Sequence, residues 1–308
     1  MLPIERQLWL GTAMWGWTVD AAEAFSMLDA WYEAGFRQID TATNYPINGI
    51  AADFRKAESI LIQWIRAHQV DDLRVWVKVG SLTNERSPDH NLSEGFILLA
   101  LEYYRQHFAD NLYVLGVHWD NRSNPKEIEA TIRALQTVRA SGLQVGLSGI
   151  RYPEIWAQVN STYGLSWLIQ LKHNLIGSDL ARYAPLANEA TFVAYGLNAG
   201  GLKLDPKAYG AHSSWRVRTG QLDEPHLMRE IRKFVTQWNA DHPRAHITAF
   251  SQLGLCFALH HPRLSGAIIG PSNVQQLRAT IQQVRTIMTH DHFAALFVAL
   301  AQLANNGR

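Results

Sequence analysis

The sequence predicts an α/β fold in the form of a single closed (β/α)₈ barrel that spans residues 1–308. Strand-like and helix-like segments alternate over most of the chain, and the strand-like segments are short apolar runs that suit a sheet buried on both faces. No stretch rich in Pro, Gly or Ser divides the chain of 308 residues. Single barrels routinely reach about 250 residues or more, so one domain accounts for the length.

Eight segments have the pattern of parallel strands. In chain order they are residues 7–11, 37–40, 75–80, 112–118, 144–148, 167–172, 191–196 and 266–270. Amphipathic stretches between them predict helices at residues 20–35, 53–68, 93–107, 125–140, 153–162, 223–240 and 274–287, and two apolar helices are expected at 246–260 and 291–304. Asp20 is a suitable N-cap and Gly35 a suitable C-cap for the first helix.

A doubly wound open sheet is the alternative architecture for such a pattern. The glycine-rich fingerprint of the open dinucleotide-binding fold does not follow the first strand, because the glycines of "LGTAMWGW" have other spacings. The barrel is therefore favoured. In a barrel, functional side chains are expected at the carboxyl ends of the strands and in the loops that follow them.

Composition limits the classes of partner and the compartment. With 28 Lys and Arg against 27 Asp and Glu, no broad field is expected to hold nucleic acid or an anionic membrane. The single cysteine, Cys256, cannot form a disulfide within the chain, which suits the cytoplasm. Neither an export signal nor an apolar run of about 18 residues is present, so no membrane span is expected.

Polar residues at three successive strand ends form the candidate catalytic set. Asp40, Lys78 and His118 are spaced by roughly one βα unit, and Tyr45 lies in the loop just after Asp40. Taken singly, Asp40 could cap a loop, His118 could be a hydrogen-bonded structural residue, and Tyr45 could cover the barrel mouth. Lys78 interrupts the apolar run "VWVKVG", and a lysine there needs a partner.

Together these four residues predict a proton relay. An unperturbed tyrosine, with a pKa of about 10, is a poor proton donor and acceptor at neutral pH. A neighbouring ammonium lowers that pKa, and a carboxylate keeps the ammonium charged. Asp40 is thus expected to orient Lys78 and Lys78 to tune Tyr45, while His118 positions the substrate oxygen.

At this point the chain resembles the aldo-keto reductase family. The segments that carry the resemblance are "DTATNYPING", "VWVKVG", "LGVHWDN", "VGLSG", "LIQLKHN", "VAYGLNAGGL" and "IIGPSNVQQLRATI". The resemblance implies a barrel that exchanges a hydride between a nicotinamide dinucleotide and an aldehyde, ketone or sugar. It also implies that Tyr45 is the general acid, that Lys78 and Asp40 tune it, and that His118 donates a hydrogen bond to the carbonyl.

The resemblance further implies a set of cofactor-binding residues. Ser148 and Gln170 match the residues that hydrogen-bond the nicotinamide carboxamide, and Tyr195 matches the ring that stacks on the nicotinamide. The remaining matched positions lie after the first, second, fifth, seventh and eighth strands: Thr12, Ala13, Asp40, Gly149, Gly196, Leu197, Asn198, Gly200, Gly270, Ser272 and Gln276. Glycines in the loop 195–202 allow the backbone to approach phosphate, and the helix after Gly270 presents its N-terminus.

Several positions depart from the family pattern. Gly196-Leu197 replaces the usual Ser-Pro, Gly149 replaces an Asn or Arg, and Ala279-Thr280 replaces the Glu-Asn that clamps adenine. The basic residue that many NADPH-dependent members place at Gly270 is missing, although Arg278 is nearby. NADP(H) is favoured over NAD(H), which is a serious rival.

A small carbonyl or alcohol compound is the expected substrate. Trp15 and Trp119 follow strands one and four and are expected to line the mouth with Tyr45 and His118, since aromatic walls suit such ligands. Residues 199–222 are a candidate lid over the site. Packing under loops is the alternative role of the tryptophans.

Two other functions remain open at this stage. A regulatory, cofactor-holding subunit of the same family is the first, and the weakened adenine clamp favours it. A metal-dependent hydrolase built on the thirteen histidines is the second, but no His-x-His motif follows a strand, and no metal ligands are assigned. The expected assembly is a monomer or a small homo-oligomer.

Overall fold

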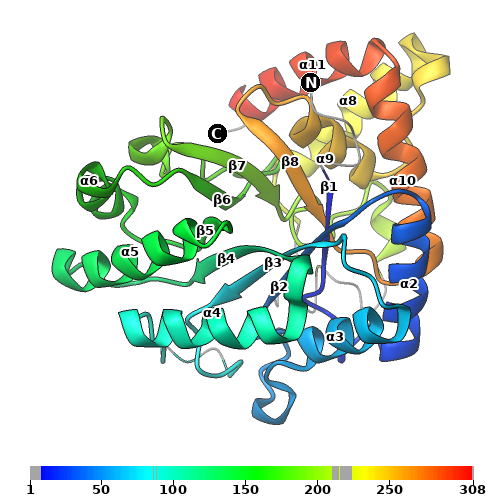
Figure 1. The fold of residues 1–308 in the computed structure, drawn as a ribbon. Helices are drawn as coiled ribbons and strands as arrows, with labels where there is room; N and C mark the ends of the chain where they lie inside the picture. The colour runs from blue at the N-terminus through cyan, green and yellow to red at the C-terminus, as the bar shows by residue number, and fades with distance from the viewer. Residues whose placement is uncertain (1–7, 86, 88, 210–214, 216–223, 307–308) are drawn as a thin grey trace.

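The strands of the computed structural model form a closed barrel surrounded by helices (Figure 1). The structure describes residues 8–85, 87, 89–209, 215 and 224–306. Strands β1 to β8 pair in chain order, all parallel, and β1 pairs with β8 to close the ring. The closed barrel is therefore confirmed, and the open doubly wound sheet is excluded.

The strands agree with the predicted segments to within two residues at every end. They are β1 (Leu8–Gly11), β2 (Gln38–Ala42), β3 (Arg74–Val79), β4 (Leu112–His118), β5 (Gln144–Ser148), β6 (Trp167–Lys172), β7 (Ala190–Tyr195) and β8 (Leu264–Ile269). Strand β2 runs two residues beyond Asp40, so Asp40 lies inside the strand and not at its end.

The helices also lie where amphipathic stretches predict them. They are α2 (Ala21–Glu33), α3 (Lys56–His68), α4 (Glu94–Phe108), α5 (Pro125–Ala140), α6 (Pro153–Tyr163), α8 (Leu227–Asp241), α9 (Phe250–Leu259), α10 (Val274–Thr289) and α11 (His292–Asn306). Short 3₁₀ turns are Ala51–Asp53, Ala109–Asn111, Ala184–Leu186, Pro206–Ala208 and Pro243–Ala245.

Capping residues of α2 illustrate one confirmed prediction and one correction. The Asp20 carboxylate accepts a hydrogen bond from the Glu23 backbone N–H at 2.8 Å and so caps the helix as predicted. The C-cap is Ala34, however, and Gly35 is the next residue, with φ +90°. Glycine adopts this left-handed backbone without strain, so Gly35 turns the chain away from the helix one residue after the cap.

Side chains inside the barrel form a small plug beneath the site. Trp9, Trp76, Val114 and Val193 pack together there, and the Trp9 and Trp76 rings meet edge to face with centroids 5.4 Å apart. A Cβ added to Gly146 would lie 2.5 Å from the Trp76 ring. The large indole therefore fits because glycine occupies the facing position on β5.

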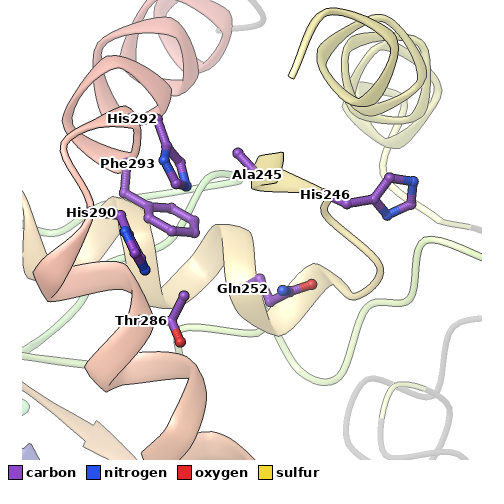
Figure 2. A pocket seen from close by; sticks show the side chains of 7 residues that line it. All are labelled: Ala245, His246, Gln252, Thr286, His290, His292 and Phe293. Carbon is purple, nitrogen blue, oxygen red and sulfur yellow. The ribbon is translucent and has the colours of Figure 1, made fainter. Parts of the chain in front are cut away.

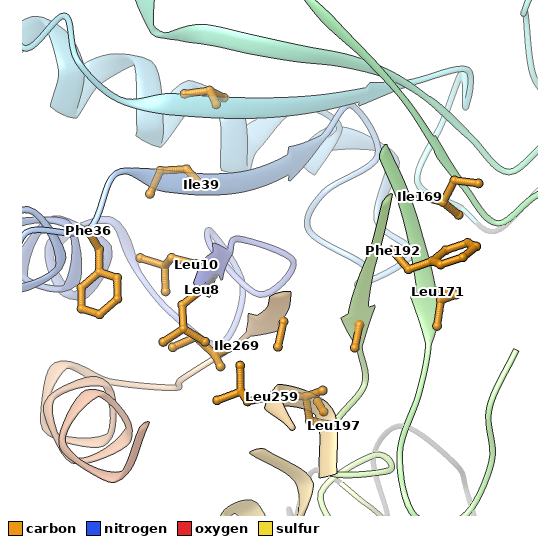
Figure 3. Close-up of a cluster of buried hydrophobic side chains, with 14 of the residues drawn as sticks. Leu8, Leu10, Phe36, Ile39, Ile169, Leu171, Phe192, Leu197, Leu259 and Ile269 are labelled. Carbon is orange, nitrogen blue, oxygen red and sulfur yellow. The ribbon is translucent and has the colours of Figure 1, made fainter. Parts of the chain in front are cut away.

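A second, larger core lies between the strands and the helices. Figure 3 shows Leu8, Leu10 and Ile39 among the strand side chains of this layer, with Leu259 of α9 nearby. The residues on either side in sequence, such as Trp9 and Asp40, take the opposite orientation because side chains alternate along a strand. This alternation directs one residue in two toward the barrel interior.

In the described part of the chain, no single helix has the length and hydropathy needed to cross a membrane. Helices α10 and α11, which meet at 96°, pass that test only when they are taken together.

Candidate active site in the barrel

Because side chains alternate between the two faces of a strand, the predicted residues point into the barrel at a similar height, above the interior plug. Lys78 follows Trp76 by two residues on β3, so both side chains face inward. In the pairing of neighbouring strands, Lys78 is opposite Gly116, and His118 is opposite Ser148. Ser148 is in turn opposite Gln170 on β6. Pairing and alternation together thus place polar side chains from several strands around one point.

Asp40 and Lys78 form a buried ion pair at this point. The Lys78 Nζ donates to Asp40 Oδ2 at 2.9 Å, and the lysine side chain is only 2% exposed. Gln170 bridges the pair: its Oε1 accepts from Lys78 Nζ at 3.0 Å, and its Nε2 donates to Asp40 Oδ1. The expected Asp40–Lys78 contact is present, and Gln170 adds a contact that the sequence did not predict.

Burial and charge act in opposite directions on this pair. Burial disfavours the charge on Lys78, but Asp40 and Tyr45 outweigh burial and raise the pKa of the lysine to about 12. Burial raises the pKa of the Asp40 carboxyl, and Lys78 and Gln170 oppose that shift. Lys78 therefore carries a full positive charge at neutral pH.

Tyr45 reaches the lysine from the loop after β2. Lys78 Nζ donates to Tyr45 Oη at 2.9 Å, and the ammonium lies 4.8 Å from the centre of the ring. The loop is anchored through its backbone, since Tyr45 N donates to Ala42 O at 3.1 Å and Ala57 N donates to Tyr45 O at 3.3 Å. The bond between Tyr45 and Pro46 is cis.

His118 completes the group on the side of β4. Its ring lies perpendicular to that of Tyr45, with centroids 6.0 Å apart. Burial and the charge of Lys78 hold the pKa of His118 well below its usual range, so the imidazole is neutral at neutral pH. Its Nδ1 lies 3.0 Å from Oδ1 of Asn44, the residue before Tyr45.

The residues matched to nicotinamide binding lie beside the Asp40–Lys78–Tyr45 group, and one of them, Gln170, is hydrogen-bonded to it. Ser148 is buried next to Gln170, and both ends of the Gln170 amide contact Lys78 and Asp40. Tyr195 ends β7 and is partly exposed. Burial, followed by Tyr183 and Asp179, raises the pKa of Tyr195 to about 12, so its phenol stays neutral.

The ends of β1 and β7 carry the next set of matched residues. Thr12 is buried, and its hydroxyl donates to the Thr41 hydroxyl at 2.9 Å, while Ala13 O accepts from Ile47 N at 3.1 Å. Leu197 is buried, and a Cβ added to Gly254 of α9 would lie 2.5 Å from Leu197 O. The loop after β7 is therefore packed closely on α9.

The rest of the loop after β7 turns through glycines. Asn174 Nδ2 donates to Gly196 O at 2.8 Å, and Asn198 O accepts from Gly201 N at 2.8 Å. Gly200 and Gly201 have φ values of +89° and +104°, a region that glycine adopts without a steric penalty. Gly200 and Gly201 therefore let the loop turn tightly, and its contact with phosphate stays a prediction.

The start of α10 is already occupied by side chains of this chain. Ser272 N donates to Gln276 Oε1 at 2.6 Å, Gln276 N donates to the N-cap Asn273 at 2.8 Å, and Val274 N donates to the Glu23 carboxylate of α2. Space beside Gly270 is open, because a Cβ built there meets nothing within 4 Å. The predicted phosphate-binding end thus carries a carboxylate.

The tryptophans differ from the expected aromatic wall in one respect. Trp119 and Trp17 are exposed, at 50% and 37%, but Trp15 is only 1% exposed and packs in the core. Trp15 therefore does not present the open ring face that a substrate wall requires. Trp119 has a left-handed backbone, φ +61°, a conformation that costs energy in residues other than glycine.

The structure explains why residue 149 is a glycine, which the sequence did not. A Cβ at this position would lie 2.8 Å from the Trp119 ring, and Trp119 N donates to Ser148 O at 2.9 Å. The missing side chain at Gly149 therefore makes room for the exposed indole.

The candidate lid at 199–222 lies partly outside the described residues. Of residues 210–222 only Trp215 is described, and it is buried. Arg216 and Arg218, two basic residues of this segment that could contact an anionic group, are not among the described residues.

A cavity outside the barrel is formed at the junction of α9, α10 and α11. It has a volume of about 360 Å³, and Figure 2 shows the side chains that line it: Ala245, His246, Gln252, Thr286, His290, His292 and Phe293. The rings of His290 and His292 are stacked, with centroids 5.5 Å apart. Across the described residues, no three His, Cys, Asp or Glu side chains are grouped to hold a metal ion.

A further cavity, of about 520 Å³, lies between α3 and α4 and includes Arg55, Lys56 and Glu58. Neither this cavity nor the one in Figure 2 contains a residue of the Asp40–Lys78–Tyr45 group. The Asp40–Lys78–Tyr45 group is the candidate site, because it combines buried charges and a phenol at the carboxyl ends of barrel strands.

The contacts of Asn44 and Glu23 could not be recognised from the sequence, and Gln170 was predicted to contact the cofactor and not the ion pair. Asn44 and Gln170 contact His118 and the ion pair, and Glu23 contacts α10 across the join between the first and last helices. Alternation along β6 was a usable signal for Gln170. Asn44 lies in an irregular loop and Glu23 on a helix surface, where periodicity does not indicate a contact.

Comparison with known proteins agrees with this geometry. A family model described as "Aldo/keto reductase family" matches residues 7–298. Over 73 residues the chain is 38% identical to a Pseudescherichia vulneris protein described as "Uncharacterized 11.2 kDa protein in crtE 3'region", a match that covers 23% of this chain and 71% of that protein. Nicotinamide-dependent oxidoreduction of carbonyl groups is the general activity of the matched family. Since the family model covers nearly the whole chain, the chain belongs to the aldo/keto reductase family.

Proposed function

We propose that this chain reduces a small aldehyde, ketone or sugar carbonyl with Tyr45 as the general acid, and catalyses the reverse oxidation of the alcohol. The observation that carries the proposal is the 2.9 Å contact between the Lys78 ammonium and the Tyr45 oxygen. Because Asp40 holds that ammonium at 2.9 Å, the charge is fixed beside the phenol before any substrate arrives.

The residues divide the proton chemistry among them. When bound, the reduced nicotinamide supplies the hydride that adds to the carbonyl carbon. Tyr45 gives its Oη proton to the carbonyl oxygen, which becomes the hydroxyl of the alcohol. Lys78 then stabilises the phenolate that remains, since a nearby positive charge favours the ionised form. In the oxidation direction the phenolate of Tyr45 takes the alcohol proton back.

Binding and orientation fall to the surrounding side chains. The neutral His118 ring lies at the side of Tyr45, where it orients the substrate oxygen. The exposed indoles of Trp119 and Trp17 offer apolar contact area near the strand ends. The cofactor would be held by Ser148, Tyr195 and the glycine-rich loop after β7, whose partial exposure and tight backbone suit a flat ring and a phosphate group.

The preference for NADP(H) over NAD(H) remains a prediction, and two observations work against it. Arg278, the first basic residue after Gly270, lies 4.0 Å from Glu33 on the exposed surface, where an ion pair is weak. The Glu23 carboxylate lies at the first turn of α10 and would repel a phosphate group there. Dissociation constants for both cofactors, measured by tryptophan fluorescence quenching, test the preference, and tighter NADH binding would contradict it.

A second candidate function is a cofactor-holding regulatory subunit with little turnover. The occupied N-terminus of α10 and the replacement of the adenine clamp by Ala279-Thr280 weaken the expected cofactor clamp, which argues against rapid turnover and in favour of this candidate. The assembled contacts among Asp40, Lys78 and Tyr45 favour the enzyme.

We also propose that residues 1–308 act as one barrel domain, as a monomer or a small homo-oligomer. The cytoplasm is the proposed location, because the single buried Cys256 has no disulfide role. No nucleic acid, membrane or resident metal enters the proposal.

The replacement Tyr45→Phe tests the proposed mechanism. Removing the hydroxyl leaves no proton for the carbonyl oxygen, so reduction of aldehydes, ketones and aldoses should fall at least about 10²-fold. NADPH binding, followed by fluorescence quenching, should persist. Unchanged turnover in this variant would exclude Tyr45 as the general acid, and absence of NADPH consumption by the unmodified protein across the carbonyl panel would favour the regulatory subunit.

A further inference from the structure

The Asn44 side chain is the partner of His118 on the side away from its Nε2 atom. Its Oδ1 lies 3.0 Å from His118 Nδ1, and the residue is partly buried just before Tyr45. Among the described residues, neither the Asn44 side chain nor His118 Nε2 makes another hydrogen bond. Within the described residues, the two side chains are thus hydrogen-bonded only to each other, while the His118 ring also packs against Tyr45 and Trp119.

A neutral imidazole has one nitrogen that donates a hydrogen bond and one that accepts. His118 is neutral because burial and the charge of Lys78 keep its pKa well below the usual range. Lys78 and Tyr45 are the titratable groups that face it from β3 and from the loop after β2. The position of the single ring hydrogen, not the charge, thus decides what Nε2 can do.

The two orientations of the Asn44 amide give opposite results. When Oδ1 faces Nδ1, the oxygen accepts from Nδ1–H and Nε2 is left as an acceptor, which repels a carbonyl oxygen. A half-turn of the amide brings Nδ2 to the same point without moving the backbone, and Nδ2 then donates to Nδ1. In that arrangement the ring hydrogen is on Nε2, which can donate to the carbonyl.

We propose that Asn44 is a positioning residue whose amide turns from the orientation in the structure, where Oδ1 faces the ring, and donates through Nδ2 to Nδ1 of His118, which keeps the ring hydrogen on Nε2 during carbonyl reduction. This inference rests on the proposed function, because only reduction of a carbonyl requires a donor at Nε2. Asn44 touches neither the substrate nor the cofactor in this role. It acts through the tautomer of His118.

The replacement Asn44→Asp provides the first test. A carboxylate has almost the same shape but can only accept a hydrogen bond, so it should move the ring hydrogen to Nδ1. Imidazole ¹⁵N chemical shifts at neutral pH report the tautomer directly, and the His118 signals can be assigned by their loss in His118→Gln. We expect Nε2–H in the unmodified protein and Nδ1–H in Asn44→Asp.

Kinetics provide the second test. In Asn44→Asp, carbonyl reduction should fall about 10²-fold where His118 is neutral, the size of effect seen when one hydrogen-bond donor to a reacting oxygen is removed. Activity should partly return as the pH is lowered, because the doubly protonated ring again has a hydrogen on Nε2. Ile50→Asp is the matched control, since it adds the same charge at an exposed position of the same loop.

The outcomes separate the inference from the proposed function. A ring hydrogen on Nδ1 in the unmodified protein, or an unchanged tautomer in Asn44→Asp, would overturn the role of Asn44. So would an activity loss equal at every pH and equal in Asn44→Leu, since that indicates packing alone. The tautomer measurement needs no turnover. If the protein showed no carbonyl reductase activity, the proposed function would be refuted, but the His118 signals would still show whether Asn44 sets the tautomer.

Discussion

Lys78 shows how one buried charge depends on three different partners. Asp40, Tyr45 and Gln170 each lie within 3.0 Å of its Nζ. A buried ion without partners is strongly unfavourable, and a paired one is tolerated when its hydrogen bonds are satisfied. Two of these partners were predicted because an ammonium needs a carboxylate and because the phenol follows it in the relay. Gln170 was assigned to the cofactor instead.

Replacing Lys78 with Met should move the pH dependence of alcohol oxidation. Without the ammonium the phenolate of Tyr45 is less stable, so oxidation should reach half of its maximal rate at a pH higher by roughly one to three units. The measurement is kcat against pH for alcohol oxidation. Lys78→Arg retains a cation and is the control, and coincident profiles of Lys78→Met and the unmodified protein would contradict the tuning role.

At the residue scale, the sequence was informative where a polar or charged residue interrupted an apolar strand. Lys78 within an apolar strand signalled a partner, because a lysine inside a barrel is unfavourable alone. Asn44 gave no such signal, since an asparagine in a loop has many ordinary roles. Trp15 was predicted to line the barrel mouth because it follows β1, but it is buried in the core. Its position just after a strand did not determine whether the side chain points to the mouth or to the core.

Among the elements, β4 and β5 are shaped by the indole that they enclose. Gly116 and Gly146 face each other in the pairing of these strands, and a Cβ on either would lie within 2.6 Å of the Trp76 ring. Distances this short force a neighbour to move, and Trp76 is fully buried. The glycines are therefore required by the interior plug and not by the strand backbone.

The replacement Gly146→Ala should destabilise the protein by about 1–3 kcal/mol, the usual effect of overpacking a core. Urea denaturation gives the free energy of unfolding. Gly95→Ala in α4 is the matched control, because a Cβ there meets nothing within 4 Å. The control should be neutral or should stabilise the helix by up to about 1 kcal/mol, and a similar effect of both changes would mean that Trp76 does not fill this space.

Element positions were predictable because each strand and helix has its own periodicity, but contacts between elements were not. The helix at α10 was expected, together with a free N-terminus for phosphate. Glu23 lies on α2, 251 residues earlier in the chain, and accepts from Val274 N. Such a contact depends on how the first and last helices pack, which local pattern does not contain.

For the molecule as a whole, Cys256 links stability to pH. Burial raises the pKa of its thiol to about 12, whereas an unfolded cysteine titrates near about 8.5. The folded protein therefore keeps a proton that the unfolded chain loses as the pH rises. Unfolding becomes more favourable through this window, with a slope from this group of about 1.4 kcal/mol per pH unit.

Cys256→Ala should remove this contribution. The free energy of unfolding of the unmodified protein is expected to fall more steeply between pH 8.5 and pH 11 than that of the variant, and the variant should be the less stable of the two at pH 7, where the lost thiol leaves a small cavity. Urea denaturation at several pH values measures both effects. Parallel curves for the two proteins would show that the thiol ionises as freely in the folded state as in the unfolded chain.

Architecture was the most predictable property at this scale. Alternating short apolar strands and amphipathic helices leave few arrangements that bury every apolar face, and the closed barrel is one of them. Packing inside the barrel was less predictable, since Trp9 and Trp76 came from strands whose sequences only indicated that they were apolar. Their meeting at 5.4 Å depends on the closure of the ring.

The pairing of β1 with β8 also bears on the synthesis of the chain. Leu8 lies opposite Ala267, so the first strand leaves the ribosome long before its second neighbour exists. At a synthesis rate of roughly 5–20 residues per second, the interval is on the order of tens of seconds. During this time one edge of β1 has no strand partner, and unpaired edges favour association with other chains. Closure of the barrel, and with it protection of that edge of β1, therefore waits until residue 269 has emerged.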